Sequence, residues 1–237
     1  IRYSDLINSL FAHGRPPIIG RPFDFLVSIG ERITIAMPIH MRKGEQTRAA
    51  ILNAALELAG RDGLEGLTIG LLADRMQMSK SGVFAHFGSR EDLQIEVLME
   101  YHRRFEEEVF APSMEAPRGL PRLRALVDRW MDKRIREVTT GCIYISGAVE
   151  YDDRAASPVR EALVKSVRLW RSALLRAITQ AKEEGHLRAD TDPRLMLFEM
   201  YSLTLGLHHD ARFLREPGAV DMTRVALEKL ISSYQRG

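Results

Sequence analysis

The chain has 237 residues, with 34 Lys and Arg against 32 Asp and Glu and a formal net charge of +2 at pH 7. This length can bury a large core without disulfide or metal staples, and one cysteine excludes an intrachain disulfide framework. The near balance of charge excludes nucleic-acid binding through bulk positive charge, and no apolar stretch of about 18 uncharged residues predicts a membrane span. Sparse cysteine favours a cytoplasmic protein.

Residues 1–40 differ from the remainder of the chain. No helical period persists in them, and four prolines interrupt them. We expect this segment to be poorly ordered. The chain begins with Ile, and Met41 directly precedes the first periodic helix. The segment is therefore either a genuine arm or sequence upstream of a natural start at Met41.

The next segment predicts two helices. The first covers about residues 47–61, with an apolar face that includes Ile51, Ala55 and Leu58, and Gly63 is placed to end it. Thr68 then suits the N-cap of a short second helix, because its hydroxyl can accept from a backbone N–H of the first turn.

Two more caps follow. Ser79 suits the N-cap of a short third helix, and Ser89 with Asp92 resembles a capping box that opens a long fourth helix over residues 90–114. Two short helices joined by a tight turn and braced by a longer helix form a helix-turn-helix, whose second helix enters a DNA major groove. The alternative is a capped surface helix with Val83, Phe84 and Phe87 in the core.

The rest of the chain also shows helical periodicity and no strand-like alternation. Turn residues separate the expected helices. They lie at about 120–138, 143–151, 159–184, 193–213 and 221–234.

Residues 47–93 resemble the TetR family of bacterial regulators. The resemblance depends on Gly63, Thr68, Ala73, the Ser79-x-x-Gly82 step, Phe84, Phe87 and the run Ser89-Arg90-Glu91-Asp92-Leu93. It implies an all-α fold with a three-helix DNA-binding domain at 41–92 and a helical effector-binding and dimerisation domain at 93–237. It further implies a ligand-responsive repressor that binds a near-palindromic DNA operator as a homodimer.

The resemblance also assigns roles to individual residues. Phosphate contacts fall on Thr47, Thr68, Ser79, His86 and Arg90, and base-reading contacts on Lys80, Ser81 and Gly82. Phe84 stands where the family often has a phosphate-binding tyrosine, so it is left with van der Waals contact to DNA or core packing. Gln77 stands where the turn often has glycine; if its φ is positive, the strain costs about 1 kcal/mol.

For the C-terminal half, the resemblance implies that the last two long helices form the dimer interface. The candidate interface residues are Met196, Leu203, Gly206, Leu207, Leu227, Leu230 and Ile231. Packing within one chain is the alternative for the same stripes. Candidate residues for a pocket that takes an apolar or aromatic effector are Trp130, Cys142, Tyr144, Trp170 and Tyr201. Buried Trp and Tyr need a polar partner that a ligand can supply.

Other function classes find less support. The sequence contains no HExxH, P-loop, GxGxxG or CxxC motif, so we expect neither an enzyme nor a cofactor; an all-helical enzyme is the weakest alternative. His208, His209 and Asp210 are adjacent and point about 100° apart on a helix, which disfavours a shared metal ion. A redox-responsive regulator that acts through Cys142 remains an alternative.

Overall fold

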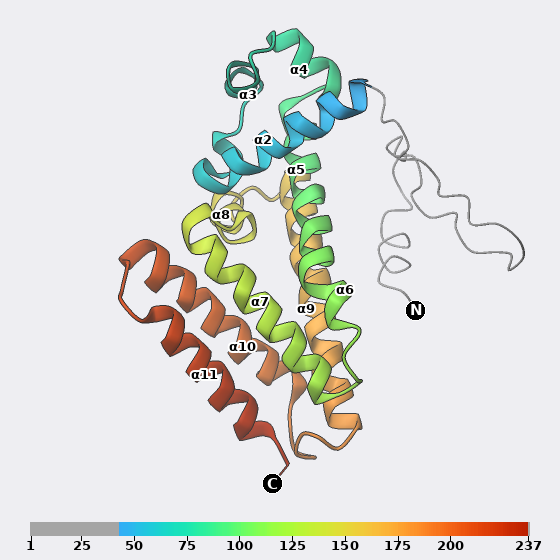
Figure 1. Cartoon of the computed structure of the whole chain (residues 1–237), viewed down its shortest axis with the longest axis vertical. Helices are drawn as coiled ribbons and strands as arrows, with labels where there is room; N and C mark the ends of the chain where they lie inside the picture. The colour runs from blue at the N-terminus through green and yellow to red at the C-terminus, as the bar shows by residue number, and fades with distance from the viewer. Residues whose placement is uncertain (1–42, 237) are drawn as a thin grey trace, which may run out of the picture. The chain divides into compact units, whose positions relative to one another are not determined.

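The computed structural model describes residues 43–236, and the expectation for residues 1–40 lies outside that range. The described residues confirm the all-α prediction, because they contain helices and a single isolated bridge between Leu187 and Gln235 but no strand. Figure 1 shows the short helices at one end of this part of the chain and two long C-terminal helices side by side.

The N-terminal part contains α2 (Lys43–Gly66), α3 (Ile69–Met76), α4 (Lys80–Phe87) and α5 (Arg90–Phe105). Gly63 has a φ of 81° and interrupts α2, so the predicted helix end is found there and a short further turn follows. The apolar face of α2 is buried, as its period predicts.

All three predicted N-caps are present. Thr68 Oγ1 accepts a hydrogen bond from the N–H of Leu71 at 3.1 Å, and Ser79 Oγ accepts from the N–H of Gly82 at 3.1 Å. Ser89 Oγ accepts from the N–H of Asp92 at 3.0 Å and donates to the Asp92 carboxylate at 2.6 Å. These bonds satisfy helix-start donors that would otherwise lack a partner.

The predicted long helix over 90–114 is not one regular α-helix. After α5 the chain continues as a π-helix, η1 (Glu106–Phe110), and a single turn, α6 (Ala111–Ser113). Pro112 explains the break, because it has no N–H to donate to the carbonyl four residues before it.

The C-terminal part agrees with the predicted helices apart from their ends. Its elements are α7 (Leu120–Thr140), α8 (Ile143–Glu150), α9 (Pro158–Glu183), α10 (Pro193–Leu207), η2 (His208–Leu214) and α11 (Ala219–Tyr234). The helix expected to run to residue 213 changes to π-helical geometry at His208.

Two hydrophobic cores hold these elements together. The first joins α2, α3, α4 and α5 to α8, whose Cys142, Ile143 and Tyr144 are buried in it. The second joins α5, α7, α9, α10 and α11 around Trp130 and Trp170. Because α5 and α8 pack against α2, the short N-terminal helices share a core with elements of the C-terminal part.

Candidate nucleic-acid interface and ligand site

The turn between α3 and α4 is built on a left-handed residue. Gln77 has φ 53° and ψ 42°, and its N–H bonds back to the carbonyls of Ala73 and Asp74. Met78 donates to the Ala73 carbonyl at 2.9 Å. The structure therefore confirms that this position requires a positive φ, which a non-glycine residue adopts at a cost.

Replacing Gln77 by Gly should raise the free energy of unfolding by about 0.5 kcal/mol, since relief of left-handed strain exceeds the added entropy of the unfolded chain. Urea unfolding at equilibrium measures this change. A Gln77→Ala control keeps the strain while it removes the amide, so its stability should stay near that of the parent chain. A Gln77→Gly variant less stable than the parent would contradict the strain argument.

Helix α4 presents one polar face and buries the other. Lys80, Ser81 and Phe84 are exposed, with 53% of Phe84 accessible, whereas Val83 and Phe87 are buried. The alternative that places Val83, Phe84 and Phe87 in the core is thus wrong for Phe84 and right for Val83 and Phe87. Gly82 and His86 are half-buried at the edge of the exposed face.

Lys80 reaches back to the start of α3. A Cβ atom at Gly70 would lie 3.4 Å from Lys80 Cε, 3.7 Å from Lys80 Nζ and 3.9 Å from Thr68 Oγ1. The ammonium group therefore lies beside the first turn of α3, where free N–H groups and the helix dipole attract an anion. This placement suits a phosphate contact better than the base-reading role that the resemblance implies.

Two further arginines brace the short helices. Arg90 donates from Nε to the Leu67 carbonyl at 3.0 Å and pairs with the Glu65 carboxylate at 3.2 Å. Arg48 pairs with Glu96 at 2.7 Å and lies over the Phe87 ring. The guanidinium of Arg90 thus already has protein partners, so a phosphate contact there would compete with them. Thr47 lies half-buried on α2.

The four aromatic residues among the predicted pocket residues form one continuous cluster with Phe105. The ring centroids of Trp130 lie 5.4 Å from those of both Trp170 and Tyr201, and Trp170 lies 4.7 Å from Phe105. Tyr144 extends the cluster to Phe105 at 6.2 Å. Tyr201 is half-buried and the other four are buried. Phe105, on α5, was missed as a site residue, because its place in the apolar stripe of that helix indicates only a core position.

A charged cluster lies beside the aromatic one. Glu137 accepts from Tyr101 Oη at 2.5 Å and from Arg134 at 3.0 Å, and it pairs with Lys133 at 3.5 Å. The Arg134 guanidinium also contacts Cys142 Sγ. Burial raises the pKa of the Tyr101 hydroxyl well above its usual value. These charged positions were missed too, since a charged helix position usually indicates a solvated face.

Three buried donors in this region have no hydrogen-bond partner within the part of the chain that the structure describes. They are the indole N–H groups of Trp130 and Trp170 and the Nε of Arg134. Leaving a buried donor unpaired costs about 1–3 kcal/mol, so each is a position where a bound acceptor would be stabilised. His102 Nδ1 and Tyr144 Oη lie 2.6 Å apart, and burial lowers the His102 pKa to about 4, so this imidazole is neutral at pH 7.

Four of the seven predicted dimer residues need correction. Met196, Leu207, Leu227 and Ile231 are buried in the core of the single chain, and Leu203 and Leu230 pack against that core. A side chain enclosed by its own subunit cannot form the contact surface of another. Gly206 is exposed, with open space where a Cβ would be.

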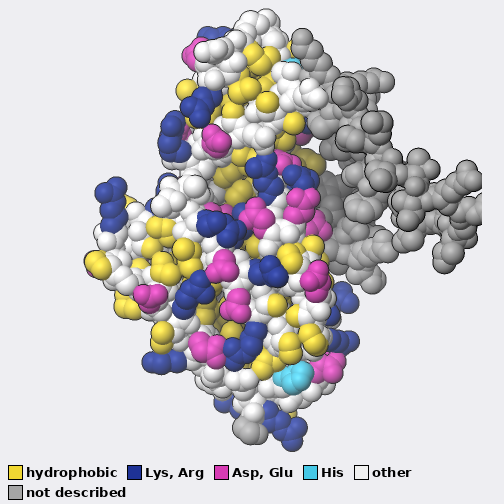
Figure 2. Space-filling model, viewed as in Figure 1, with side chains coloured by type: hydrophobic (Ala, Val, Ile, Leu, Met, Phe, Trp, Pro, Cys, Tyr) yellow, Lys and Arg dark blue, Asp and Glu magenta, His cyan; other side chains and the backbone are white. Residues whose placement is uncertain are grey.

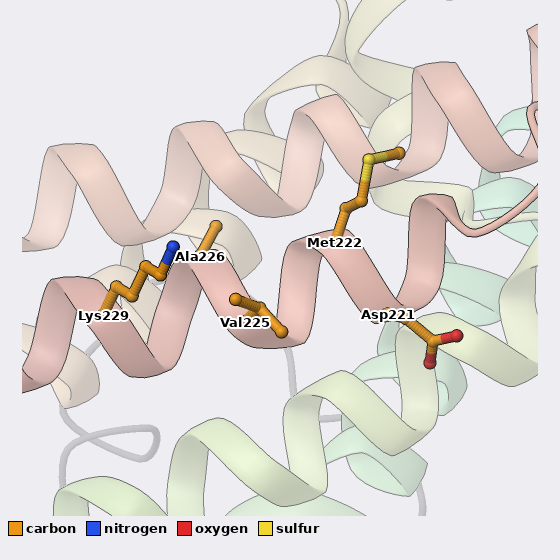
Figure 3. A pocket seen from close by; sticks show the side chains of 5 residues that line it. All are labelled: Asp221, Met222, Val225, Ala226 and Lys229. Carbon is orange, nitrogen blue, oxygen red and sulfur yellow. The ribbon is translucent and has the colours of Figure 1, made fainter.

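Other apolar residues of the last two long helices are exposed instead. We call this set the apolar face; it consists of Leu195, Phe198, Leu205, Met222 and Val225. Met222 and Val225 line a shallow groove of about 380 Å³ along α11 (Figure 3). On the side that Figure 2 displays, hydrophobic, basic and acidic side chains are interspersed. Arg124 pairs with Glu228 at 2.5 Å and Arg224 with Asp132 at 2.7 Å, which joins α7 to α11.

The described residues contain no group of three His, Cys, Asp or Glu side chains that could hold a metal ion. His209 Nδ1 lies 2.9 Å from Asp210. None of the described helices is both long and apolar enough to span a membrane.

Two family models match the chain. Residues 51–97 match the model of bacterial regulatory proteins of the tetR family, and residues 119–227 match that of the tetracyclin repressor-like C-terminal domain. No curated protein matches by sequence. The two matches cover both the helix-turn-helix and the helices that carry the aromatic cluster.

Solved structures show the same fold. A TetR transcriptional regulator from Chloroflexus aurantiacus superposes with a TM-score of 0.72 and 23% identity, over 83% of this chain and 99% of that one. A TetR-family regulator from Cytophaga hutchinsonii superposes with a TM-score of 0.70 and 18% sequence identity, over 84% of this chain and 100% of that one. A TetR-family regulator from Streptomyces coelicolor has a TM-score of 0.68 and 18% sequence identity, over 81% of this chain and 97% of that one. With both family models matched in order and this fold, the chain belongs to the TetR family of bacterial transcriptional regulators.

Proposed function

We propose that this regulator is a cytoplasmic, homodimeric repressor that a small apolar or aromatic effector releases from a near-palindromic operator. The observation that carries the proposal is that α5 contacts both the short helices and the buried aromatic cluster. We keep the proposed division into a DNA-binding domain at 41–92 and an effector-binding and dimerisation domain at 93–237.

The proposed DNA surface is the exposed side of α4 with the start of α3. Ser81 and Gly82 face the bases, and the exposed ring of Phe84 makes van der Waals contact. Lys80 and Thr68 bind a phosphate beside the first turn of α3. Ser79 and His86 are further phosphate contacts at the ends of α4.

Dimerisation is assigned to the apolar face. Single apolar residues on a surface are common, but five on two neighbouring helices suggest an interaction site. A dimer is also needed because one short helix reads too few base pairs for selective binding.

Effector release requires that the two states of the protein bind the effector differently. At one end of α5, Arg90 bonds to the segment between α2 and α3; near the other end, Tyr101 and Phe105 contact Tyr144 and Trp170. A tilt of α5 would change the separation of the two reading helices, which must match major grooves about 34 Å apart.

Helix α8 provides a second connection. Its C-terminal residue Glu150 accepts from the N–H of Glu65 at 2.9 Å, and Tyr144 near its N-terminus belongs to the aromatic cluster. An effector that displaces Tyr144 would therefore move a group bonded directly to α2.

The proposal predicts that Lys80→Ala weakens binding to operator and to random DNA about equally, by roughly 1 kcal/mol each, because a phosphate contact carries no sequence information. Operator DNA is first selected from genomic fragments that the protein retains. The affinities of both proteins are then measured at several salt concentrations. These give the loss of binding free energy, and the slope of log affinity against log salt concentration should be smaller by about 1 in the variant. Arg61→Ala, at an exposed site on α2 away from α4, serves as control.

If Lys80→Ala lowers operator affinity alone, Lys80 reads a base. If it changes neither, α4 is not the DNA-contacting helix and the proposed interface fails. Ser81→Ala provides a comparison, since the loss of a base contact should affect the operator more than random DNA.

The redox alternative has one supporting observation. Cys142 Sγ touches the Arg134 guanidinium and lies 3.5 Å from Tyr101 Oη. Its burial shields it from oxidants in solution. Effector binding is therefore the preferred mechanism.

A further inference from the structure

A groove between α9 and α10 has a distinctly basic rim. The groove has a volume of about 300 Å³. Four of its lining residues belong to α9 and two belong to α10. The lining residues are Arg168, Arg171, Ser172, Leu175, Arg194 and Leu197. The apolar floor and the guanidinium rim together suit a molecule with an apolar body and an anionic group.

No carboxylate among the described residues pairs with these three arginines. Near Arg194, the Asp192 carboxylate caps α10 through the backbone N–H of Arg194 at 2.8 Å, and Glu199 accepts from Tyr234 Oη at 2.7 Å. By contrast, Arg124 and Arg224 on the neighbouring surface both have carboxylate partners. The groove thus concentrates positive charge that the described part of the chain does not neutralise.

The groove adjoins the aromatic cluster through one side chain. The Arg171 guanidinium carbon lies 4.6 Å from the centroid of the Tyr201 ring. The centroid of the same ring lies 5.4 Å from that of Trp130, which belongs to the buried cluster. Tyr201 is half-buried, and its ring contacts both a residue that lines the groove and a residue of the buried cluster.

On the buried side of this connection, three donors have no acceptor among the described residues. Trp130 and Trp170 each hold an unpaired indole N–H, and the Nε of Arg134, whose guanidinium lies 5.8 Å from the Trp130 ring, is also unpaired. All three groups are donors only. A molecule that bears acceptors on an aromatic body would satisfy donors that the protein leaves unsatisfied.

From these observations we infer that the effector is an aromatic anion. Its carboxylate or phosphate binds Arg168, Arg171 and Arg194 at the rim, and its aromatic body passes Tyr201 to stack against Trp130 and Trp170. This inference rests on the proposed effector control and names the class of molecule that exerts it.

Calorimetry with the full chain tests the inference through four matched probes: 2-naphthoate, 2-naphthyl phosphate, 2-naphthamide and 2-naphthylmethylammonium. We expect at least one anion to bind at least tenfold more tightly than the amide and the ammonium compound, and to quench tryptophan fluorescence. The anion preferred shows whether the rim suits a carboxylate or a phosphate. Arg171→Met with Arg194→Met should abolish the preference, and the two Arg→Lys changes should restore part of it.

Arg176→Met is the matched control, because Arg176 lies on the same helix but does not line the groove. It should leave every affinity unchanged. Equal affinities for anion and amide, no effect of the double Met variant, or no binding of any probe at millimolar concentration would overturn the inference. A double Met variant that becomes monomeric would show instead that the groove is an interface between two copies.

Release of operator DNA is measured separately, which distinguishes the two proposals. If 2-naphthoate binds with the expected arginine dependence but leaves operator affinity unchanged, the anion site stands and effector control fails. If apolar uncharged compounds release the operator while the anions do not bind, effector control stands and the anion site fails.

Discussion

A Phe198→Glu, Leu205→Glu variant should be monomeric and should bind the operator at least about 100-fold more weakly than the parent chain, because two linked reading helices gain that much from simultaneous contact. Phe198 is 62% exposed and Leu205 45% exposed on α10, so the glutamates stay solvated in a single chain. In a dimer they would place charges in an apolar interface, where an unpaired charge is costly. Sedimentation and operator titration measure the two effects.

Val149→Glu is the control for this variant. Val149 is an apolar residue of α8 with 72% exposure, so the change adds a negative charge outside the apolar face. It should leave both the dimer and operator affinity intact. A double variant that remains dimeric, with unchanged helix content, would show that the apolar face is not the interface.

Much of the N-terminal fold was predictable because its signals are local. A Ser or Thr before a helical period specifies a cap through its own backbone neighbours, which is why Thr68, Ser79 and Ser89 were correctly assigned. The strained turn at Gln77 was found through a departure from the expected glycine. The break at residues 106–110 was missed, although Pro112 carried the signal.

The partner of an apolar residue is not a local property. Helix α10 is apolar on both sides: Met196 and Leu207 face the core while Phe198 and Leu205 face outward. Hydrophobic period alone cannot tell an intrachain contact from a subunit contact, so the sequence did not distinguish the two sides of α10. The same applies to charge: Arg134 and Lys133 are helical neighbours of Glu137 on α7, but Tyr101, which donates to the same carboxylate, comes from α5.

The strongest stability effect is expected at the contact of α2 with the turn between α7 and α8. Gly141 has a φ of 88°, and a Cβ there would overlap the carbonyl oxygen of Gly60, so this glycine packs closely on α2. Gly141→Ala should lower the free energy of unfolding by about 3 kcal/mol or more, from left-handed strain and a clash with rigid backbone. Gly218→Ala is the matched control, since Gly218 has a φ of 79° but open space around a Cβ, and it should cost only about 1 kcal/mol. Urea unfolding of both variants separates the two causes. Equal losses would mean that α2 moves away freely, in which case the contact does not hold the short N-terminal helices to the C-terminal part of the chain.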